Sequence, residues 1–265
     1  NLCNIRKMVL LVPFFLLGCT QAVLNHFNEE ILEKNNDAFI LVPKYTILYS
    51  STFLYPKYVE YKLSKGILTN INKPNRVLLN FHLANYNAPK YNFSESGFEE
   101  GHLLPKRYFD SIHEGVLYEN FLISPQTEKL NSSPWLVIEN LIYNLSIDTN
   151  ISNVHVICGG LSDSTSKKLN NVFTIPDYYY KVVLVDRKEN IFPRFEIFGY
   201  LLPNKTDVKC KCNYIKSVKE IEEITGFNFF QNLKISNIEN LKKNNSTHLN
   251  TKCNQNCIQK SKSTK

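Results

Sequence analysis

The sequence predicts a protein of the α+β class with most of its core in strands. Seven segments are rich in β-branched and aromatic residues and have strand length, whereas only two have helical spacing of apolar residues. The two kinds of segment alternate irregularly and show no internal repeat, unlike the regular alternation of parallel α/β folds. The predicted strands are 39–43, 45–49, 55–61, 77–81, 154–158, 179–185 and 195–203, and the predicted helices are 135–145 and 218–230.

Taken in order, the chain begins its strand-rich part at about residue 38. Residues 23–37 have weak helical spacing and form a lead-in segment. Ser217 is suited to cap the second helix, because Glu220 follows three residues later and can complete a capping box. We therefore divide the chain into a signal peptide (8–22), the lead-in segment (23–37), a folded domain (38–232) and a basic, Cys-containing C-terminal tail (233–265). Within this tail, residues 242–265 have few apolar residues and are expected to be flexible unless the cysteines hold them.

Composition excludes a disordered chain. The 265 residues are 43% hydrophobic and 12% aromatic, which is enough for a full core. The formal net charge of +7 favours an anionic partner such as nucleic acid or an acidic surface. Much of the excess lies in the last few dozen residues, so a basic solubilising tail explains the charge equally well.

The N-terminus predicts secretion. A basic start, a short apolar run and small residues before Ala22 are typical of a signal peptide over 8–22, with Met8 as the natural start. The run is too short to span a bilayer, so no membrane span is expected. The segment ending at Cys19 also resembles a bacterial lipoprotein box. The Asn-X-Ser/Thr sequons favour a eukaryotic secretory route; they begin at Asn92, Asn144, Asn150, Asn204, Asn244 and Asn245. Asn131-Ser132-Ser133 also has the form of a sequon.

Five cysteines remain after the signal peptide. Cys158 lies in an apolar run and is expected to be a buried free thiol. The other four can form two disulfides that tie the tail to the body, as suits an oxidising compartment. A four-Cys zinc site is the alternative, although Cys-X-Cys is not its usual spacing. These four, whose pairing the sequence leaves open, are Cys210, Cys212, Cys253 and Cys257.

The stretch 97–139 carries the candidate chemistry, which is metal-dependent phosphodiester hydrolysis. His102 follows a glycine and can take a proton from water near neutral pH. Asn131 stands at a helix start, and its amide oxygen is an ordinary Mg²⁺ ligand. Trp135 and Glu139 follow at intervals of four, so they share one side of that helix. The plainer interpretation is a core histidine, a helix-start asparagine and a solvated glutamate.

This order of residues resembles the DNA/RNA non-specific endonuclease family, the ββα-metal nucleases that include mitochondrial endonuclease G. The family's Asp-Arg-Gly-His-Leu-Ala-Pro is matched by Glu-Glu-Gly-His-Leu-Leu-Pro at 99–105, and its Asn-Ile-Ser-Pro-Gln by Leu-Ile-Ser-Pro-Gln at 122–126. The resemblance covers roughly residues 40–232. Further matches, in the family's order, are Leu130-Asn131, Trp135, Ile138-Glu139, 156–160, 175–183, 202–204 and 221–230.

The resemblance implies a ββα-metal (His-Me finger) nuclease fold around a mostly antiparallel central sheet. It implies that His102 is the general base, that Asn131 is the direct protein ligand of Mg²⁺, or of Mn²⁺ in its place, and that Glu139 orients the waters of the metal. It also implies a partner, DNA or RNA, which is held by its backbone with little sequence preference.

The motif is degenerate at three positions. Glu99 stands for the family's Asp, Glu100 for its Arg and Leu122 for the Asn of its second block. Glu100 places an anion where a cation should face a phosphate, and Lys106 or Arg107 are the candidate replacements. Two hypotheses therefore stay open: a secreted Mg²⁺-dependent endonuclease for DNA and RNA, or an inactive nuclease-like binding module, as in the C-terminal domains of ectonucleotide pyrophosphatase/phosphodiesterases.

Overall fold

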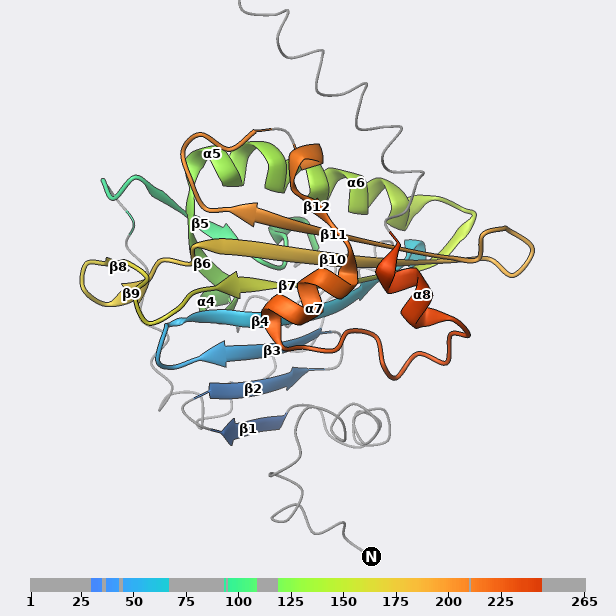
Figure 1. The fold of residues 1–265 in the computed structure, drawn as a ribbon, viewed down its shortest axis with the longest axis horizontal. Coiled ribbons are helices and arrows are strands. Elements are labelled where there is room, and N and C mark those ends of the chain that lie inside the picture. The colour runs from blue at the N-terminus through green and yellow to red at the C-terminus, as the bar shows by residue number, and fades with distance from the viewer. Residues whose placement is uncertain are drawn as a thin grey trace, which may run out of the picture.

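An eight-stranded antiparallel sheet forms the body of the protein (Figure 1). The computed structural model describes residues 30–34, 37–42, 45–66, 93, 95–108, 119–209 and 211–244. The strand order is β1-β2-β3-β4-β7-β10-β11-β12. The bounds are β1 (Glu30–Lys34), β2 (Asp37–Val42), β3 (Tyr45–Ser50), β4 (Tyr55–Leu63), β7 (Ile151–Leu161), β10 (Tyr178–Arg187), β11 (Phe195–Pro203) and β12 (Ile215–Lys216).

The remaining elements lie around this sheet. Neighbouring strands β4 and β7 are joined by a long connection, which contains the hairpin of β5 (Phe98–His102) and β6 (Ile123–Thr127). A second small hairpin pairs β8 (Lys168–Leu169) with β9 (Phe173–Thr174). The helical elements are η2 (Lys106–Tyr108), α4 (Glu119–Leu122), α5 (Glu128–Leu130), the π-turn η4 (Asn131–Trp135), α6 (Leu136–Ile147), η5 (Lys211–Tyr214), α7 (Val218–Thr225) and α8 (Ile238–Lys243).

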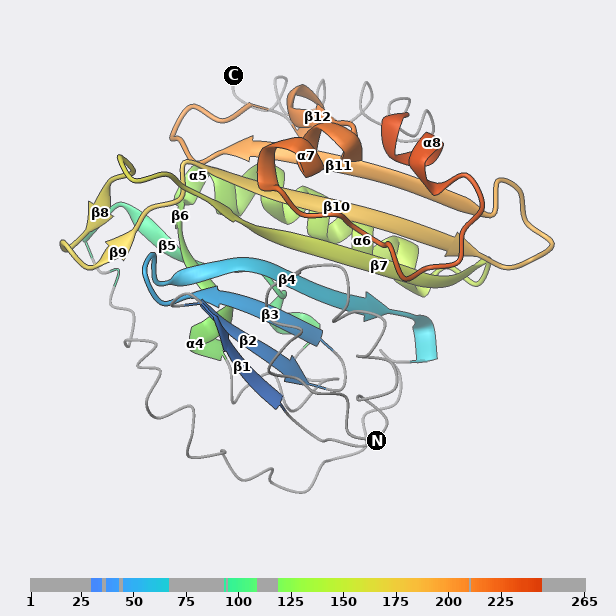
Figure 2. The same ribbon diagram turned by 60° about the horizontal axis from the view of Figure 1, so that its bottom comes forward.

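The central strands are buried on both faces. Side chains of a strand alternate between its two faces, so β10 supplies two separate cores. Tyr179 and Val183 pack with Trp135 and helix α6 on one face, whereas Val182 and Leu184 pack with helix α7 on the other. Figures 1 and 2 show α6 and α7 on opposite sides of the sheet. The α+β class and the mostly antiparallel sheet are confirmed.

The structure differs from the sequence prediction in two elements. Residues 30–34, which fall in the lead-in segment with weak helical spacing, form β1 because β2 supplies its hydrogen-bond partners. The predicted helix 218–230 ends at Thr225, since Gly226 adopts a left-handed φ of 72° and caps it. The capping box of Ser217 and Glu220 is confirmed. The predicted strand 77–81 and the signal peptide lie outside the described residues.

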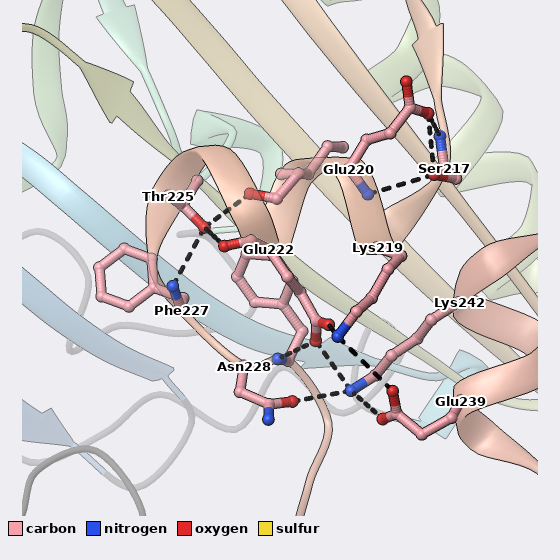
Figure 3. Close-up of polar contacts among 11 residues, drawn as sticks. Ser217, Lys219, Glu220, Glu222, Thr225, Phe227, Asn228, Glu239 and Lys242 are labelled. Carbon is pink, nitrogen blue, oxygen red and sulfur yellow. Dashed lines mark hydrogen bonds and ion pairs between the residues drawn. The ribbon is translucent and has the colours of Figure 1, made fainter.

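Part of the predicted tail is packed on the sheet. Within 233–265 the structure contains α8, whose Lys242 is fully buried. Its amine lies 2.8 Å from a carboxylate oxygen of Glu222, 3.0 Å from one of Glu239 and 2.8 Å from the amide oxygen of Asn228 (Figure 3). These bonds join α8 to α7 and to the loop between them.

The buried free thiol predicted for Cys158 is confirmed. Cys210, Cys253 and Cys257 lie outside the described residues. Within the part of the chain that the structure describes, no helix is long and apolar enough to cross a membrane.

Strand β7 approaches β4 so closely that Gly159 has no room for a side chain. A Cβ at this position would collide with the backbone carbonyl of Lys57 and would lie 2.8 Å from the ring of Tyr180. Because a backbone neighbour cannot rotate away, we expect Gly159→Ala to lower the free energy of unfolding by about 1–3 kcal/mol. Urea denaturation measures this, and an unchanged midpoint and slope would show that the strands can separate freely here.

Candidate active site

The β5–β6 hairpin carries the His-containing motif and leads directly into a helix. Its register pairs Glu99 with Gln126 and His102 with Ile123. After β6 the chain runs through α5 and the π-turn into α6 without leaving helical structure. Gly101 is required in the hairpin, because a Cβ there would collide with the buried side chain of Gln126. The motif therefore lies on a ββα unit.

Trp135 joins this unit to the sheet. Its side chain is 1% exposed, and its Nε1–H donates to the backbone carbonyl of His102 at 3.4 Å. The indole meets the ring of Tyr179 of β10 edge to face, with 5.8 Å between centroids. The hydroxyl of Tyr179 in turn donates to the carbonyl of Pro125 in β6 at 2.8 Å. Hairpin, helix and sheet thus meet at one side chain.

The His102 ring is partly exposed and has a fixed tautomer. Its Nδ1 lies 2.9 Å from the backbone carbonyl of Glu100. A carbonyl only accepts, so Nδ1 carries the proton and Nε2 holds the lone pair in the neutral ring. The partial exposure contradicts the plainer interpretation of a core histidine. The ring is suited to act as a base through Nε2.

Asn131 is oriented by Glu99. Its Nδ2 donates to a carboxylate oxygen of Glu99 at 2.8 Å. Because an ionised carboxylate only accepts, this bond fixes the amide with its nitrogen toward Glu99 and its oxygen available for another partner. Glu99 differs from the Asp of the family motif, but its carboxylate has a clear function, which is to orient Asn131. The preceding turn is capped by Thr127, whose hydroxyl accepts from the N–H of Leu130 at 3.3 Å.

Glu139 is buried between two cations. Its side chain lies one turn beyond Trp135, and the residue is 8% exposed. One carboxylate oxygen lies 3.6 Å from Nζ of Lys181, and the other lies 3.9 Å from the guanidinium of Arg107. Burial raises the pKa of this carboxyl above its usual value, and the two cations oppose that rise. The plainer interpretation of a solvated glutamate is wrong.

The residues flanking the motif differ in what they can do. Arg107 is committed to α6, because its guanidinium donates to the amide oxygen of Asn140 at 2.9 Å and lies 5.5 Å above the ring of Tyr143. The side chain of Lys106 lies outside the described residues. Glu100 is exposed. Leu122, which replaces the Asn of the family's second block, is fully buried in the core, where its apolar side chain is held by packing.

Sequence reasoning missed Lys181 as a member of the site. This residue is 0% exposed, and its Nζ lies 3.6 Å from the centroid of the Trp135 ring. A single lysine within the apolar run of β10 was the available signal, since a lysine is almost never fully buried without a partner.

A second residue outside the predicted site, Asn204, ties β6 to the sheet. Its Nδ2 donates to the carbonyls of Pro125 and Pro176, each at 2.9 Å, and its amide oxygen accepts from the N–H of Thr127 at 2.8 Å. All the polar atoms of this side chain are therefore engaged within the protein.

A hairpin bearing His102, followed by a helix bearing Asn131 and Glu139 and packed on an antiparallel sheet, defines a ββα-metal nuclease fold. Residues 24–236 match the family described as DNA/RNA non-specific endonuclease. The chain belongs to this family. A search of curated protein sequences found no match.

Solved structures support the same fold. One similar chain comes from the crystal structure of the EndoG/EndoGI complex, whose subject is the mechanism of EndoG inhibition. The two chains superpose with a TM-score of 0.56 at 16% sequence identity, over 81% of this chain and 92% of the other. At this identity the likeness establishes the fold.

The Glu99–Asn131 bond can be tested by its contribution to stability. Glu99→Leu removes the acceptor and should lower the free energy of unfolding by about 1 kcal/mol, as for a partly exposed bond to a charged group. Glu99→Gln keeps an acceptor oxygen and is the matched control, with a smaller loss. Chemical denaturation of the three proteins measures both effects. Equal stability of the Leu variant and the wild type would show that Asn131 does not depend on Glu99.

Proposed function

We propose that the protein is a secreted, metal-dependent endonuclease that hydrolyses phosphodiester bonds of DNA and RNA with little sequence preference. One observation supports this most directly. The ββα unit places a histidine, whose Nδ1 is bonded to the carbonyl of Glu100, and an asparagine, whose amide nitrogen is bonded to Glu99. These two bonds leave the lone pair of the neutral imidazole on Nε2 and direct the amide nitrogen, not the oxygen, toward Glu99. A proton acceptor and a hard-metal ligand are the two groups that this reaction needs.

The donor set suits Mg²⁺, or Mn²⁺ in its place. The amide oxygen of Asn131 is a hard ligand, and the bond to Glu99 engages the amide nitrogen and not this oxygen. Among the described residues no group of three or more His, Cys, Asp and Glu side chains could form a cage. This arrangement fits a site with one direct protein ligand, in which water and phosphate oxygens complete the octahedron. A metal bound there would supply Lewis-acid stabilisation of the transition state and of the leaving 3′ oxygen.

The chain's own residues divide the remaining work. Nε2 of His102 takes the proton of the attacking water as its oxygen approaches phosphorus, and the carbonyl of Glu100 keeps the ring in the required tautomer. The carboxylate of Glu139 accepts hydrogen bonds from ordered water near Asn131. Binding through the sugar-phosphate backbone accounts for the low sequence preference.

Glu100 favours a second candidate function, that of an inactive nuclease-like binding module. Its exposed carboxylate replaces an arginine beside His102, and repulsion of phosphate weakens both substrate binding and the transition state. Arg107, a candidate to replace the lost cation, is held by Asn140 of α6. A measurement of cleavage decides between the two functions.

Secretion is supported by the apolar run 9–18 and by the placement of sequons. Asn144 and Asn150 are exposed and suited to carry glycans. The side chain of Asn204 is fully engaged in hydrogen bonds, and that of Asn131 is bonded to Glu99, so neither is suited to modification in the folded protein.

We expect His102→Ala to lower cleavage of plasmid DNA and total RNA by at least about 100-fold, because it removes the general base. Wild-type cleavage should require Mg²⁺ or Mn²⁺ and stop in EDTA. His155→Ala is the matched control, since His155 lies on the opposite face of the sheet and should leave cleavage intact. Circular dichroism checks that the variants are folded. Equal cleavage by His102→Ala would disprove the assignment, and a wild-type protein that never cleaves would favour the binding module.

Charge reversal at Glu100 should increase activity. Glu100→Arg restores a cation beside the phosphate site, and we expect kcat/KM to rise about tenfold, which corresponds to about 1.4 kcal/mol of transition-state stabilisation. Glu223→Arg on the far face makes the same change in net charge and should have a much smaller effect at physiological salt. If kcat/KM of Glu100→Arg is no higher than that of Glu223→Arg, another cation already faces the phosphate.

A further inference from the structure

We propose that Lys181 is a positioning residue of this active site, which holds the carboxylate of Glu139 charged and in place from inside the core. The inference rests on the proposed function, because it assigns a task to Glu139 in that site. It concerns a lysine that lies on the sheet, outside the ββα unit.

Lys181 occupies an unusual position for a charged residue. It lies in the middle of β10, paired with Cys158 of β7 on one side and with Tyr200 of β11 on the other. Tyr179 and Val183 flank it on the same face, and all four neighbours are buried. A charged amine is costly in such surroundings unless opposite charge or a π-system compensates it.

Two side chains of the same helical stretch provide that compensation. Nζ of Lys181 lies 3.6 Å from the centroid of Trp135 and 3.6 Å from a carboxylate oxygen of Glu139. The second distance exceeds that of a hydrogen bond, and within the described residues Nζ has no hydrogen-bond partner. Its attraction to Glu139 is therefore mainly Coulombic, which is strong because the pair is shielded from water.

Other groups around Glu139 cannot replace this cation. Arg107 faces the other carboxylate oxygen at 3.9 Å, but it is partly exposed and bonded to Asn140. The remaining titratable neighbours come from three further elements, and burial raises the pKa of each, that of Cys158 to about 12, so they stay neutral near pH 7. They are Tyr108 of η2, Tyr61 of β4 and Cys158 of β7.

The effect of Lys181 on the protonation of Glu139 distinguishes this role from ordinary core packing. Burial raises the pKa of Glu139, and Lys181 is the neighbour that opposes the rise most strongly. Without the amine, the buried carboxyl gains a proton more readily and loses its ability to accept hydrogen bonds from water with both oxygens. A lysine that only filled space would leave the protonation of Glu139 unchanged.

The first test is the pH dependence of cleavage. Lys181→Met keeps the length and apolar stem of the side chain, and we expect it to lower the cleavage rate at pH 7 by about tenfold and to move the acid limb of the pH–rate profile to higher pH. Lys242→Met is the matched control, because Lys242 is equally buried but pairs with Glu222 and Glu239 on the other face. It should lose stability without any movement of the profile. A Lys181→Met profile at the wild-type position would overturn the proposal.

The second test does not need nuclease activity. A carboxyl whose pKa is raised on folding stabilises the protein at low pH, and this stabilisation is lost as pH rises through the folded-state pKa. As pH rises from 5 to 8, we expect the stability of Lys181→Met to fall relative to that of the double variant Lys181→Met/Glu139→Gln. This fall should be larger than the fall of the wild type relative to Glu139→Gln over the same pH range. Thermal unfolding of the four proteins measures this.

The two tests separate the two ideas. Equal pH dependence in both pairs of variants would overturn the role of Lys181 even if the wild type is an active nuclease. A wild type that cleaves neither DNA nor RNA would contradict the proposed function, and the stability comparison would then decide alone whether Lys181 controls the charge of Glu139.

Discussion

The position of Trp135 is the constraint on which the active-site geometry depends. Its N–H donates to the carbonyl of His102, its ring meets the ring of Tyr179 edge to face, and the amine of Lys181 lies over its face. These three contacts are made with the hairpin and with strand β10 of the sheet. Asn131 and Glu139 lie one turn before and one turn after Trp135 on the same helical stretch. The indole therefore fixes the position of the helix relative to His102. A shift of the indole would move the side chains of Asn131 and Glu139 together.

Adjacent carboxylates in the motif have opposite consequences because side chains of a strand alternate. Glu99 points toward the helix and orients Asn131, so a glutamate can serve where the family has an aspartate. Glu100 is exposed on the side of His102, where an anion in place of a cation repels a phosphate directly. Glu99 keeps the negative charge that the family has at its position, whereas Glu100 reverses the charge at the next position.

The sequence was sufficient for the fold class and for the order of the candidate site residues. His102, Asn131 and Glu139 could be chosen because each residue type has a specific chemical use and because their order resembles one family. Lys181 could not be placed beside Glu139, since that contact depends on how α6 lies across β10. The roles of Glu99 and Leu122 depend in the same way on tertiary neighbours, and β1 forms a strand only because β2 lies beside it.

The connection between β4 and β7 also has a consequence for biosynthesis. His102, Asn131 and Glu139 all lie in that connection, and they leave the ribosome before β7, β10 and β11. A nascent chain that stops before β7 contains these three residues but lacks the strands against which Trp135 packs. Pairing β4 with β7 also requires closure of a long loop, which is slow compared with local hairpin formation. The supporting structure is thus completed last, when most of the chain has left the translation machinery and its RNA.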